Sequence, residues 1–287
     1  MPCGGPWWLA PPSPRHHIAV DQWQIWRVVR LAPLRLAGAT AYLSPMHRYA
    51  NPARFVRFAK AVTPWSAALT ALLFVIGLYL ALVASPPDFQ QGQTVRIMYV
   101  HVPAAWMALF VYASMCGAAV MGLVWRHPLA DLFTKAVAPI GATFTAICLI
   151  TGSLWGEPMW GTWWVWDARL TSVLILFFLY LGYMALVGAF DDPDRGLRSG
   201  AILVLVGSVN LPIIKFSVDW WSTLHQPASI STLERMADPA IDSTMVPPLM
   251  VMAAAYLVLF VTLALVRTRA EIGDRRIQMI RLAQAAS

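Results

Sequence analysis

The sequence predicts an all-α, polytopic membrane protein with six transmembrane helices, and two observations carry this prediction: the composition and six long uncharged runs. Hydrophobic residues make up 59% of the 287 residues and charged residues only 12%, against about 45–50% and about 25% in soluble globular proteins. The mean hydropathy is +0.60. So few charges cannot cover the surface of a water-soluble fold, which argues against a disordered chain and against a soluble enzyme.

Each of the six runs lacks Asp, Glu, Lys and Arg. About 20 apolar residues cross the hydrocarbon core as a helix, and in lipid a helix satisfies all of its own backbone polar groups. The run 199–214 is short, so we extend it through Lys215 and Asp219, which lie one helical turn apart and can neutralise each other near the membrane edge. The expected helices span about 64–85, 98–124, 136–155, 169–190, 199–219 and 245–266.

The distribution of basic residues predicts that both termini are cytoplasmic, because Lys and Arg collect on that side of membrane proteins. With this topology only Arg96, Arg169, Lys215 and Arg235 lie outside. The remaining basic residues fall in the inside segments 1–60, 126–135, 191–198 and 267–287. The net charge of +7 is therefore explained without a nucleic-acid partner.

The first 45 residues differ from the rest of the chain. They are rich in Pro, show no helical period, and lack the basic start and apolar core of a secretory signal. We expect 1–45 to be a disordered extension, or to precede a true translation start at Met46. The six-helix domain then covers 46–270, and 271–287 form a basic cytoplasmic tail.

Several function classes lack their motifs in this sequence. The cysteines Cys3, Cys116 and Cys148 form neither CxxC nor CxxCH, which argues against a dithiol oxidoreductase and against a covalently attached haem. No Gly-Lys dipeptide is present, so there is no Walker A motif. We therefore expect a handling or transport subunit rather than an enzyme, with any energy supplied by a partner.

The run from Trp155 to Thr171 stands out, and we call it the tryptophan segment. Gly156, Pro158 and Gly161 predict that it is a shaped loop rather than a helix end. A belt of Trp side chains at the membrane interface is the simpler alternative. The segment holds five of the chain's 14 tryptophans, namely Trp155, Trp160, Trp163, Trp164 and Trp166.

The spacing within the tryptophan segment indicates a binding surface. Trp160, Trp163 and Trp164 are spaced i, i+3, i+4, so a short helix after Pro158 would align their indoles on one face. Asp167 is placed to cap the next helix, with Arg169 close behind it. A broad apolar face of this kind suits a large, flat, apolar ligand.

Two histidines lie on the same side of the membrane as the tryptophan segment. His101 is at the outer mouth of the helix 98–124, and His225 is in the outer loop that follows 199–219. Each alone would most often be a structural residue, but together they flank a Trp-rich surface. The other four histidines are expected to be solvated: His16, His17, His47 and His127.

A pair of outward histidines beside indoles is suited to a metal-centred macrocycle. Haem iron takes imidazole axial ligands, Trp faces can stack on the ring, and Arg96 or Arg169 can meet a propionate. A bare zinc site fits less well because no third His or Cys is near in sequence. A zinc site nevertheless remains an alternative, because the carboxylates of Glu157, Asp167 and Asp219 could serve as ligands.

The tryptophan segment, which ends in WGTWWVWDARLT, resembles the WWD signature of haem-handling membrane proteins. Chain length, six helices and the order His101, tryptophan segment, His225 are similar to the CcmC family, the haem exporter protein C of bacterial cytochrome c maturation. The resemblance covers about 46–270. The CcmF-like and CcsA-like relatives are larger, carry more helices and histidines, and match less well.

The resemblance implies a function and a set of partners. The protein would bind haem b, transiently and without a covalent bond, at the periplasmic face of the bacterial inner membrane, with His101 and His225 as axial ligands. It would deliver the haem to the chaperone CcmE, in a complex with the ATPase CcmA and the membrane subunits CcmB and CcmD. The alternatives are a cytochrome b-like redox subunit, a non-haem transporter and an assembly scaffold. The expected platform consists of Trp155, Trp160, Trp163, Trp164, Trp166, Asp167 and Arg169.

Overall fold

The computed structural model describes residues 51–226 and 241–285. Within them the chain is helical, and six segments are long and apolar enough to cross a membrane, which confirms the predicted fold class. The expectations for 1–45, for a start at Met46 and for Arg235 lie outside the described residues. The side of the membrane on which each end lies stays a prediction from the basic residues.

From α2 to α7 the helices follow one another with short connections. A π-helical turn, Leu80–Ala84, continues the first of them, and 3₁₀ turns at Gln93–Ile97 and Ser243–Met245 precede the second and the last. The fifth crossing segment consists of two helices in succession. The α-helices are α2 (Pro52–Tyr79), α3 (Met98–Trp125), α4 (Pro128–Trp160), α5 (Ala168–Gly188), α6 (Pro193–Gly207), α7 (Asn210–Trp220) and α9 (Val246–Ala285).

Several helices extend beyond the uncharged runs from which they were predicted. Helix α2 begins at Pro52 rather than near residue 64, because the Asn51 side chain accepts hydrogen bonds from the backbone N–H groups of Ala53 and Arg54, at 2.9 and 3.4 Å. Helix α9 continues through the basic tail for 40 residues in all. Uncharged runs mark the part of a helix that sits in lipid, whereas capping residues set where it starts.

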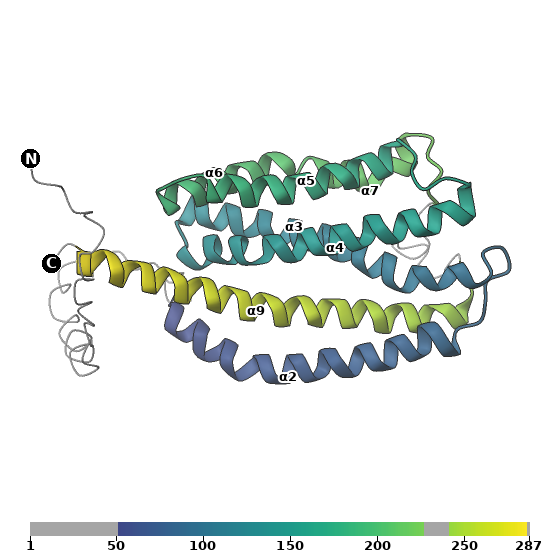
Figure 1. The fold of residues 1–287 in the computed structure, drawn as a ribbon, viewed down its shortest axis with the longest axis horizontal. Coiled ribbons are helices and arrows are strands. Elements are labelled where there is room, and N and C mark those ends of the chain that lie inside the picture. The colour runs from purple at the N-terminus through teal and green to yellow at the C-terminus, as the bar shows by residue number, and fades with distance from the viewer. Residues whose placement is uncertain (1–50, 227–240, 286–287) are drawn as a thin grey trace, which may run out of the picture. The chain divides into compact units, whose positions relative to one another are not determined.

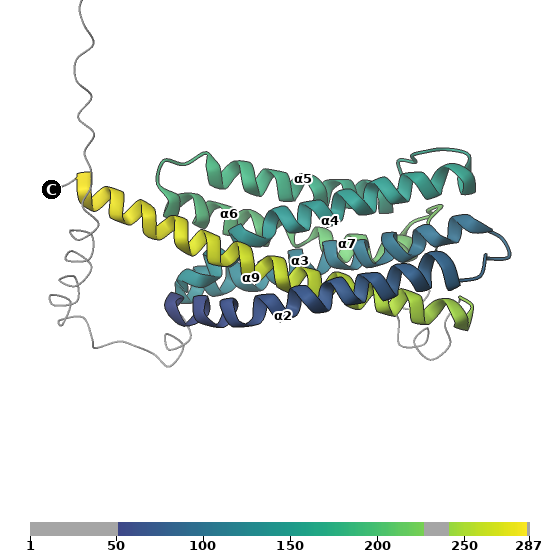
Figure 2. The same ribbon diagram turned by 60° about the horizontal axis from the view of Figure 1, so that its bottom comes forward.

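The helices pack in layers, with α3 and α4 between two outer groups (Figures 1 and 2). On one side α5 packs on α4, and α6 and α7 pack on α5. On the other side α9 contacts both α3 and α4, and α2 packs on α9. The predicted fifth helix is interrupted at Ser208 and Val209, and its second part, α7, packs along α5.

Small residues let these helices approach closely. A Cβ atom added at Gly141 of α4 would lie 2.2 Å from the ring of Tyr180, which is fully buried and donates a hydrogen bond of 2.8 Å from its hydroxyl to the Ala108 carbonyl of α3. Glycine at such contacts is the usual device for helix packing in membranes. Tyr180 thereby joins α3, α4 and α5 around the space where the site lies.

Candidate functional site

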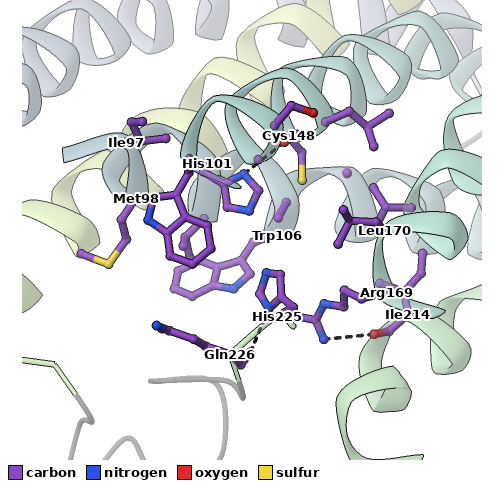
Figure 3. Close-up of a pocket in the computed structure, with 18 of the residues that line it drawn as sticks. Ile97, Met98, His101, Trp106, Cys148, Arg169, Leu170, Ile214, His225 and Gln226 are labelled. Carbon is purple, nitrogen blue, oxygen red and sulfur yellow. Dashed lines mark hydrogen bonds between the residues drawn. The ribbon is translucent and has the colours of Figure 1, made fainter. Parts of the chain in front are cut away.

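A cavity of about 260 Å³ opens at the end of the bundle where α3 begins and α4 ends (Figure 3). Its walls come from α3, α4, α5, α7 and α9 together with the chain after α7. Most of the lining is aliphatic or aromatic. The residues that carry chemistry are Gln91, His101, Trp106, Cys148, Trp155, Trp160, Trp164, Arg169, Lys215, His225 and Gln226.

His101 lies in the first turn of α3 and is held against α4. Its Nδ1 atom is 3.1 Å from the carbonyl oxygen of Cys148 and 3.1 Å from the hydroxyl oxygen of Thr151. A carbonyl can only accept, so Nδ1 carries the proton and Nε2 keeps its lone pair. Gly152 leaves room for the ring, because a Cβ atom there would lie 3.1 Å from Cε1 of His101.

His225 is anchored in the same way from the chain that follows α7. Its Nδ1 atom donates to the carbonyl oxygen of Gln226 at 2.8 Å, which again leaves Nε2 free. Burial and the positive charge of Arg169 lower the pKa of His225 below its ordinary value. A lowered pKa keeps this imidazole neutral at pH 7, the form that ligates a metal.

The two imidazoles face each other across the cavity (Figure 3), with ring centroids 6.4 Å apart and planes inclined by 34°. An imidazole nitrogen lies about 2.0–2.1 Å from a metal that it ligates, so two rings on opposite sides of one ion have centroids about 6 Å apart. The observed separation fits two axial ligands of a single iron. Within the described residues no group of three or more His, Cys, Asp and Glu side chains converges, so the zinc alternative gains no ligand set there.

The tryptophan segment is more helical than its sequence indicates. Helix α4 continues through Gly156 and Pro158 to Trp160, and it ends at Gly161, whose φ of +72° closes the helix with a hydrogen bond of 2.9 Å to the Glu157 carbonyl. The prediction of a loop was therefore wrong for residues 156–160, whereas residues 161–167 do lie outside any helix. A proline so near the helix end removes only one hydrogen bond, which membrane helices tolerate.

The segment divides into a cavity half and an outer half. Trp155, Trp160 and Trp164 line the cavity, and the Nε1 atom of Trp155 donates to the side-chain oxygen of Gln91 at 2.9 Å. Trp163 and Trp166 do not line it and are 58% and 76% exposed. Because α4 ends at Trp160 and residues 161–167 are not helical, Trp160, Trp163 and Trp164 do not share the single flat face that their spacing suggested.

Asp167 and Arg169 have different roles although they lie two residues apart. Asp167 caps α5 as predicted, since its Oδ1 atom accepts from the backbone N–H of Leu170 at 2.8 Å, and it does not line the cavity. Arg169 does line the cavity, and it donates to the carbonyl oxygen of Ile214 on α7 at 3.2 Å (Figure 3). Arg96 instead donates to the Ser85 carbonyl at 3.3 Å and is not among the lining residues.

Residues 45–283 match the family model of CcmC, described as heme exporter protein C. The chain belongs to the CcmC family. A heme exporter protein C of Bradyrhizobium diazoefficiens is 57% identical over 237 residues, which cover 83% of this chain and 89% of the relative. Those of Haemophilus influenzae and Escherichia coli are 50% and 48% identical, over 79% and 78% of this chain and 91% and 89% of the relatives.

Several residues that line the cavity were not predicted from the sequence. Met98, Val102, Ala105 and Trp106 of α3 all line it beside His101. The first three recur at intervals of three and four residues around His101, which is the spacing of one helix face. That spacing in the sequence could have predicted them. Lys215 and Gln226 line the cavity because of where α7 and the turn after it lie, which the sequence pattern does not indicate.

Proposed function

We propose that this protein binds haem b, without a covalent bond, at the periplasmic face of the bacterial inner membrane and hands it on for cytochrome c maturation. One observation carries the proposal: His101 and His225 face each other at 6.4 Å with both Nδ1 atoms anchored on carbonyl oxygens. This arrangement leaves both Nε2 atoms free, so the two imidazoles could ligate one iron. The relatives are named heme exporter protein C, which agrees with that cargo.

The walls of the cavity suit a flat apolar ring with an anionic edge. Trp106, Trp160 and Trp164 supply aromatic surface, while Arg169 and Lys215 supply positive charge that can meet carboxylates. The volume of about 260 Å³ lies below the range of about 300–1,000 Å³ typical for enclosed ligand sites. Part of the macrocycle edge would therefore stay outside the cavity, where an acceptor protein can reach it.

Delivery to a chaperone requires affinity that is moderate and a face that is exposed. We propose that the chaperone is CcmE, and that the exposed indoles of Trp163 and Trp166 contribute to its docking surface. Exposed aromatic side chains are common anchors of protein interfaces. The sequence carries no Walker A motif, so the ATPase CcmA would supply the energy, in a complex that also holds CcmB and CcmD.

The test is a visible absorption spectrum of the purified full chain, co-expressed with the other subunits, beside His101→Ala and His225→Ala. We expect a low-spin Soret band in the parent that is lost or shifted to high spin in both variants. His127→Ala is the matched control, because His127 directly precedes α4 at the opposite end of the bundle. Full haem content in both cavity variants would refute the axial assignment.

A transfer experiment separates haem delivery from a redox subunit and from a scaffold. Haem-loaded protein is mixed with haem-free CcmE, and the spectra of the two proteins are followed after separation. Delivery predicts that haem moves to CcmE. Retention of the haem would favour the cytochrome b-like reading, and a well-folded parent that never contains haem would favour the scaffold or a non-haem transporter.

A further inference from the structure

A second cavity, of about 360 Å³, lies at the end of the bundle opposite the two histidines. It is walled by four helices and by the turn between α5 and α6. We call it the lower cavity. The residues that line it are Leu132, Lys135, Pro139, Tyr183, Met184, Val187, Gly188, Phe190, Pro193, Leu197, Arg267, Glu271, Asp274, Arg275 and Gln278.

The walls of the lower cavity divide into an apolar and a charged side. The α5 and α6 walls carry only apolar or aromatic groups, such as Met184, Val187 and Leu197. The α9 wall is almost wholly polar, and Lys135 of α4 faces it through an ion pair of 2.8 Å to Glu271. A space with one apolar and one charged wall at a membrane boundary suits an amphiphile with a charged head.

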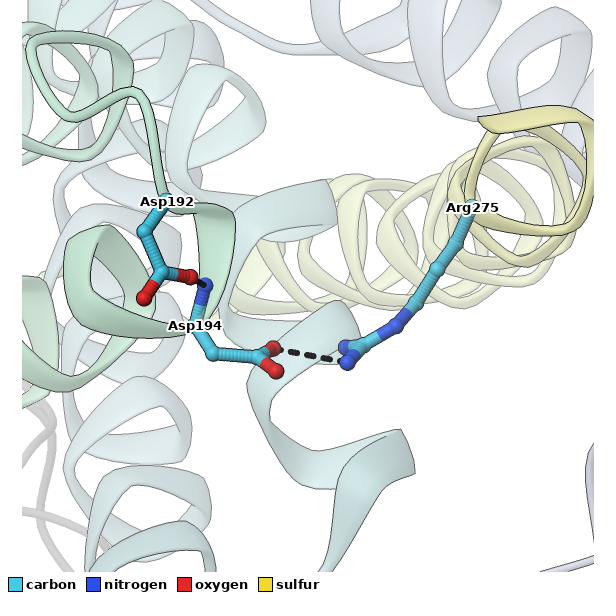
Figure 4. A network of polar contacts seen from close by, with 3 residues as sticks. All are labelled: Asp192, Asp194 and Arg275. Atoms are coloured by element: carbon cyan, nitrogen blue, oxygen red, sulfur yellow. Dashed lines mark hydrogen bonds and ion pairs between the residues drawn. The ribbon is translucent and has the colours of Figure 1, made fainter. Parts of the chain in front are cut away.

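The cations of this wall differ in how far they are neutralised. Arg275 is paired with Asp194 at 2.6 Å, and Asp194 itself is held by the cap of α6, where Asp192 accepts from its backbone N–H (Figure 4). Lys135 is paired with Glu271. Among the described residues no acid forms an ion pair with Arg267.

Arg267 is nevertheless fixed in place. Its Nε atom donates to the carbonyl oxygen of Ala136 on α4 at 2.8 Å, which holds the guanidinium between α9 and α4. The two Nη groups remain as a fork, the geometry that matches a phosphate. Lys135, the residue before Ala136 on α4, also lines the lower cavity, so a second cation is available there.

We propose that the lower cavity binds an anionic phospholipid of the adjacent leaflet, with its phosphate on Arg267 and Lys135 and an acyl chain along α5 and α6. The lipid would fill the space between α9 and the α5–α6 pair. Basic pockets between membrane helices are known to accept such head groups, and each basic residue near a membrane surface contributes about fivefold to binding of an anionic lipid.

The test uses the full-length protein, purified in a neutral detergent and freed of lipid, with native mass spectrometry to count bound lipids. Phosphatidylglycerol is added, with phosphatidylcholine and inorganic phosphate in separate arms. We expect one retained phosphatidylglycerol and a raised melting temperature. Arg267→Gln should weaken this binding about fivefold, whereas Arg195→Gln, whose exposed side chain pairs with Asp192 outside the cavity, should not.

A second variant keeps the proposal open to refutation if Arg267→Gln folds poorly. Glu271→Gln removes the acid that pairs with Lys135 and repels a phosphate, so it should tighten phosphatidylglycerol binding several-fold. Equal binding of phosphatidylcholine, equal protection by inorganic phosphate, or no retained lipid would each overturn the proposal. Loss of the lipid on assembly with the other subunits would also overturn it, because a partner would then occupy the lower cavity.

Discussion

The Nδ1 atom of His101 lies 3.1 Å from the carbonyl oxygen of Cys148, about two turns of α4 before Trp155, the first tryptophan with which this helix lines the cavity. This contact couples His101, the proposed ligand, to the helix that carries the aromatic wall. Since the carbonyl cannot donate, it also decides which ring nitrogen faces the cavity. The geometry of the site therefore depends on the register between α3 and α4.

Thr151 supports the same nitrogen, and its removal should weaken haem binding without abolishing it. In Thr151→Val the hydroxyl oxygen 3.1 Å from Nδ1 of His101 is lost, while the Cys148 carbonyl remains. Loss of a group that orients a ligand typically costs 10–100-fold in affinity, and we expect about tenfold here. Haem titration followed at the Soret band measures it.

The matched control for that variant is Thr143→Val on the same helix. Thr143 is exposed and its hydroxyl donates only to the Pro139 carbonyl within α4, at 2.8 Å. Both variants lose one hydroxyl of the same kind, so any difference reports the contact with His101. Equal affinities in the two variants would show that Thr151 does not orient the ring.

Substitutions in the two halves of the tryptophan segment should affect different properties, namely haem affinity and haem transfer. Trp164→Ala removes an indole that lines the cavity, so haem affinity should drop about tenfold. Trp163→Ala and Trp166→Ala remove exposed indoles, so haem affinity should stay within about twofold while transfer to CcmE slows. Spectra of the purified variants and the transfer assay measure the two effects. If all three variants lost haem equally, the whole tryptophan segment would act as the haem-binding platform that its spacing suggested.

Haem retention should resist acid below the ordinary pKa of histidine, about 6.5. The pKa of His225 is lowered, so the neutral ligating form persists as the pH falls through that value. Because the pKa of His225 is higher in the unfolded chain than in the folded protein, the unfolded chain binds more protons below pH 6.5. Acid therefore also reduces the free energy of unfolding. A pH titration of the low-spin Soret band should have its midpoint below 6.5.

Arg169→Gln tests the cause of that shift. Removing the positive charge raises the pKa of His225 toward its ordinary value, so the low-spin band should be lost at a higher pH than in the parent. Arg195→Gln, at the opposite end of the bundle, should leave the midpoint unchanged. A midpoint that stays fixed or moves to lower pH in Arg169→Gln would contradict the electrostatic account.

Much of the fold and part of the site could be predicted from residues alone. Hydropathy gives the six crossing segments because lipid forces every backbone group into a helix, and the order of the segments places His101 and His225 at one end. The cap formed by Asp167 also followed from its position before an apolar run. These features depend on local chemistry or on topology, which a single sequence records.

The division of the tryptophan segment could not be predicted in this way. Which indoles face the cavity depends on the continuation of α4 past Pro158 and on the positive φ at Gly161, which turns the chain. The contribution of Trp106 depends on how α3 is rotated against α4. Both are results of packing between helices, for which sequence spacing gives at most the face of one helix.

Asp167 should stabilise the fold through its helix cap, and its negative charge should not be needed for haem binding. Asp167→Ala loses the cap on Leu170 and should lower the free energy of unfolding by about 1 kcal/mol, whereas Asp167→Asn keeps an acceptor and should be nearly neutral. Asp192→Ala, which loses the cap of α6 at the other end, is the matched control for stability. Thermal unfolding and haem content are measured together. A folded Asp167→Asn protein without haem would show that the carboxylate charge acts on the ligand.

The contact between Gly141 and Tyr180 should be a sensitive packing site between α4 and α5, two of the helices that wall the cavity. In Gly141→Ala the new Cβ atom would lie 2.2 Å from the Tyr180 ring, so the ring must move and strain its hydrogen bond to Ala108. Overpacking of a filled core costs about 1–3 kcal/mol. Thermal unfolding in detergent should show a lower melting temperature, and haem affinity should fall as α3 and α5 separate.

Gly117→Ala is the control for that substitution, because a Cβ atom there meets open space. Both changes add one methyl group to a glycine inside a membrane helix and carry the same gain in helix propensity. The control should therefore match the parent or exceed it in melting temperature. A Gly141→Ala protein as stable as the control would mean that Tyr180 can shift freely, and the link from α5 to α3 would then not hold the cavity in shape.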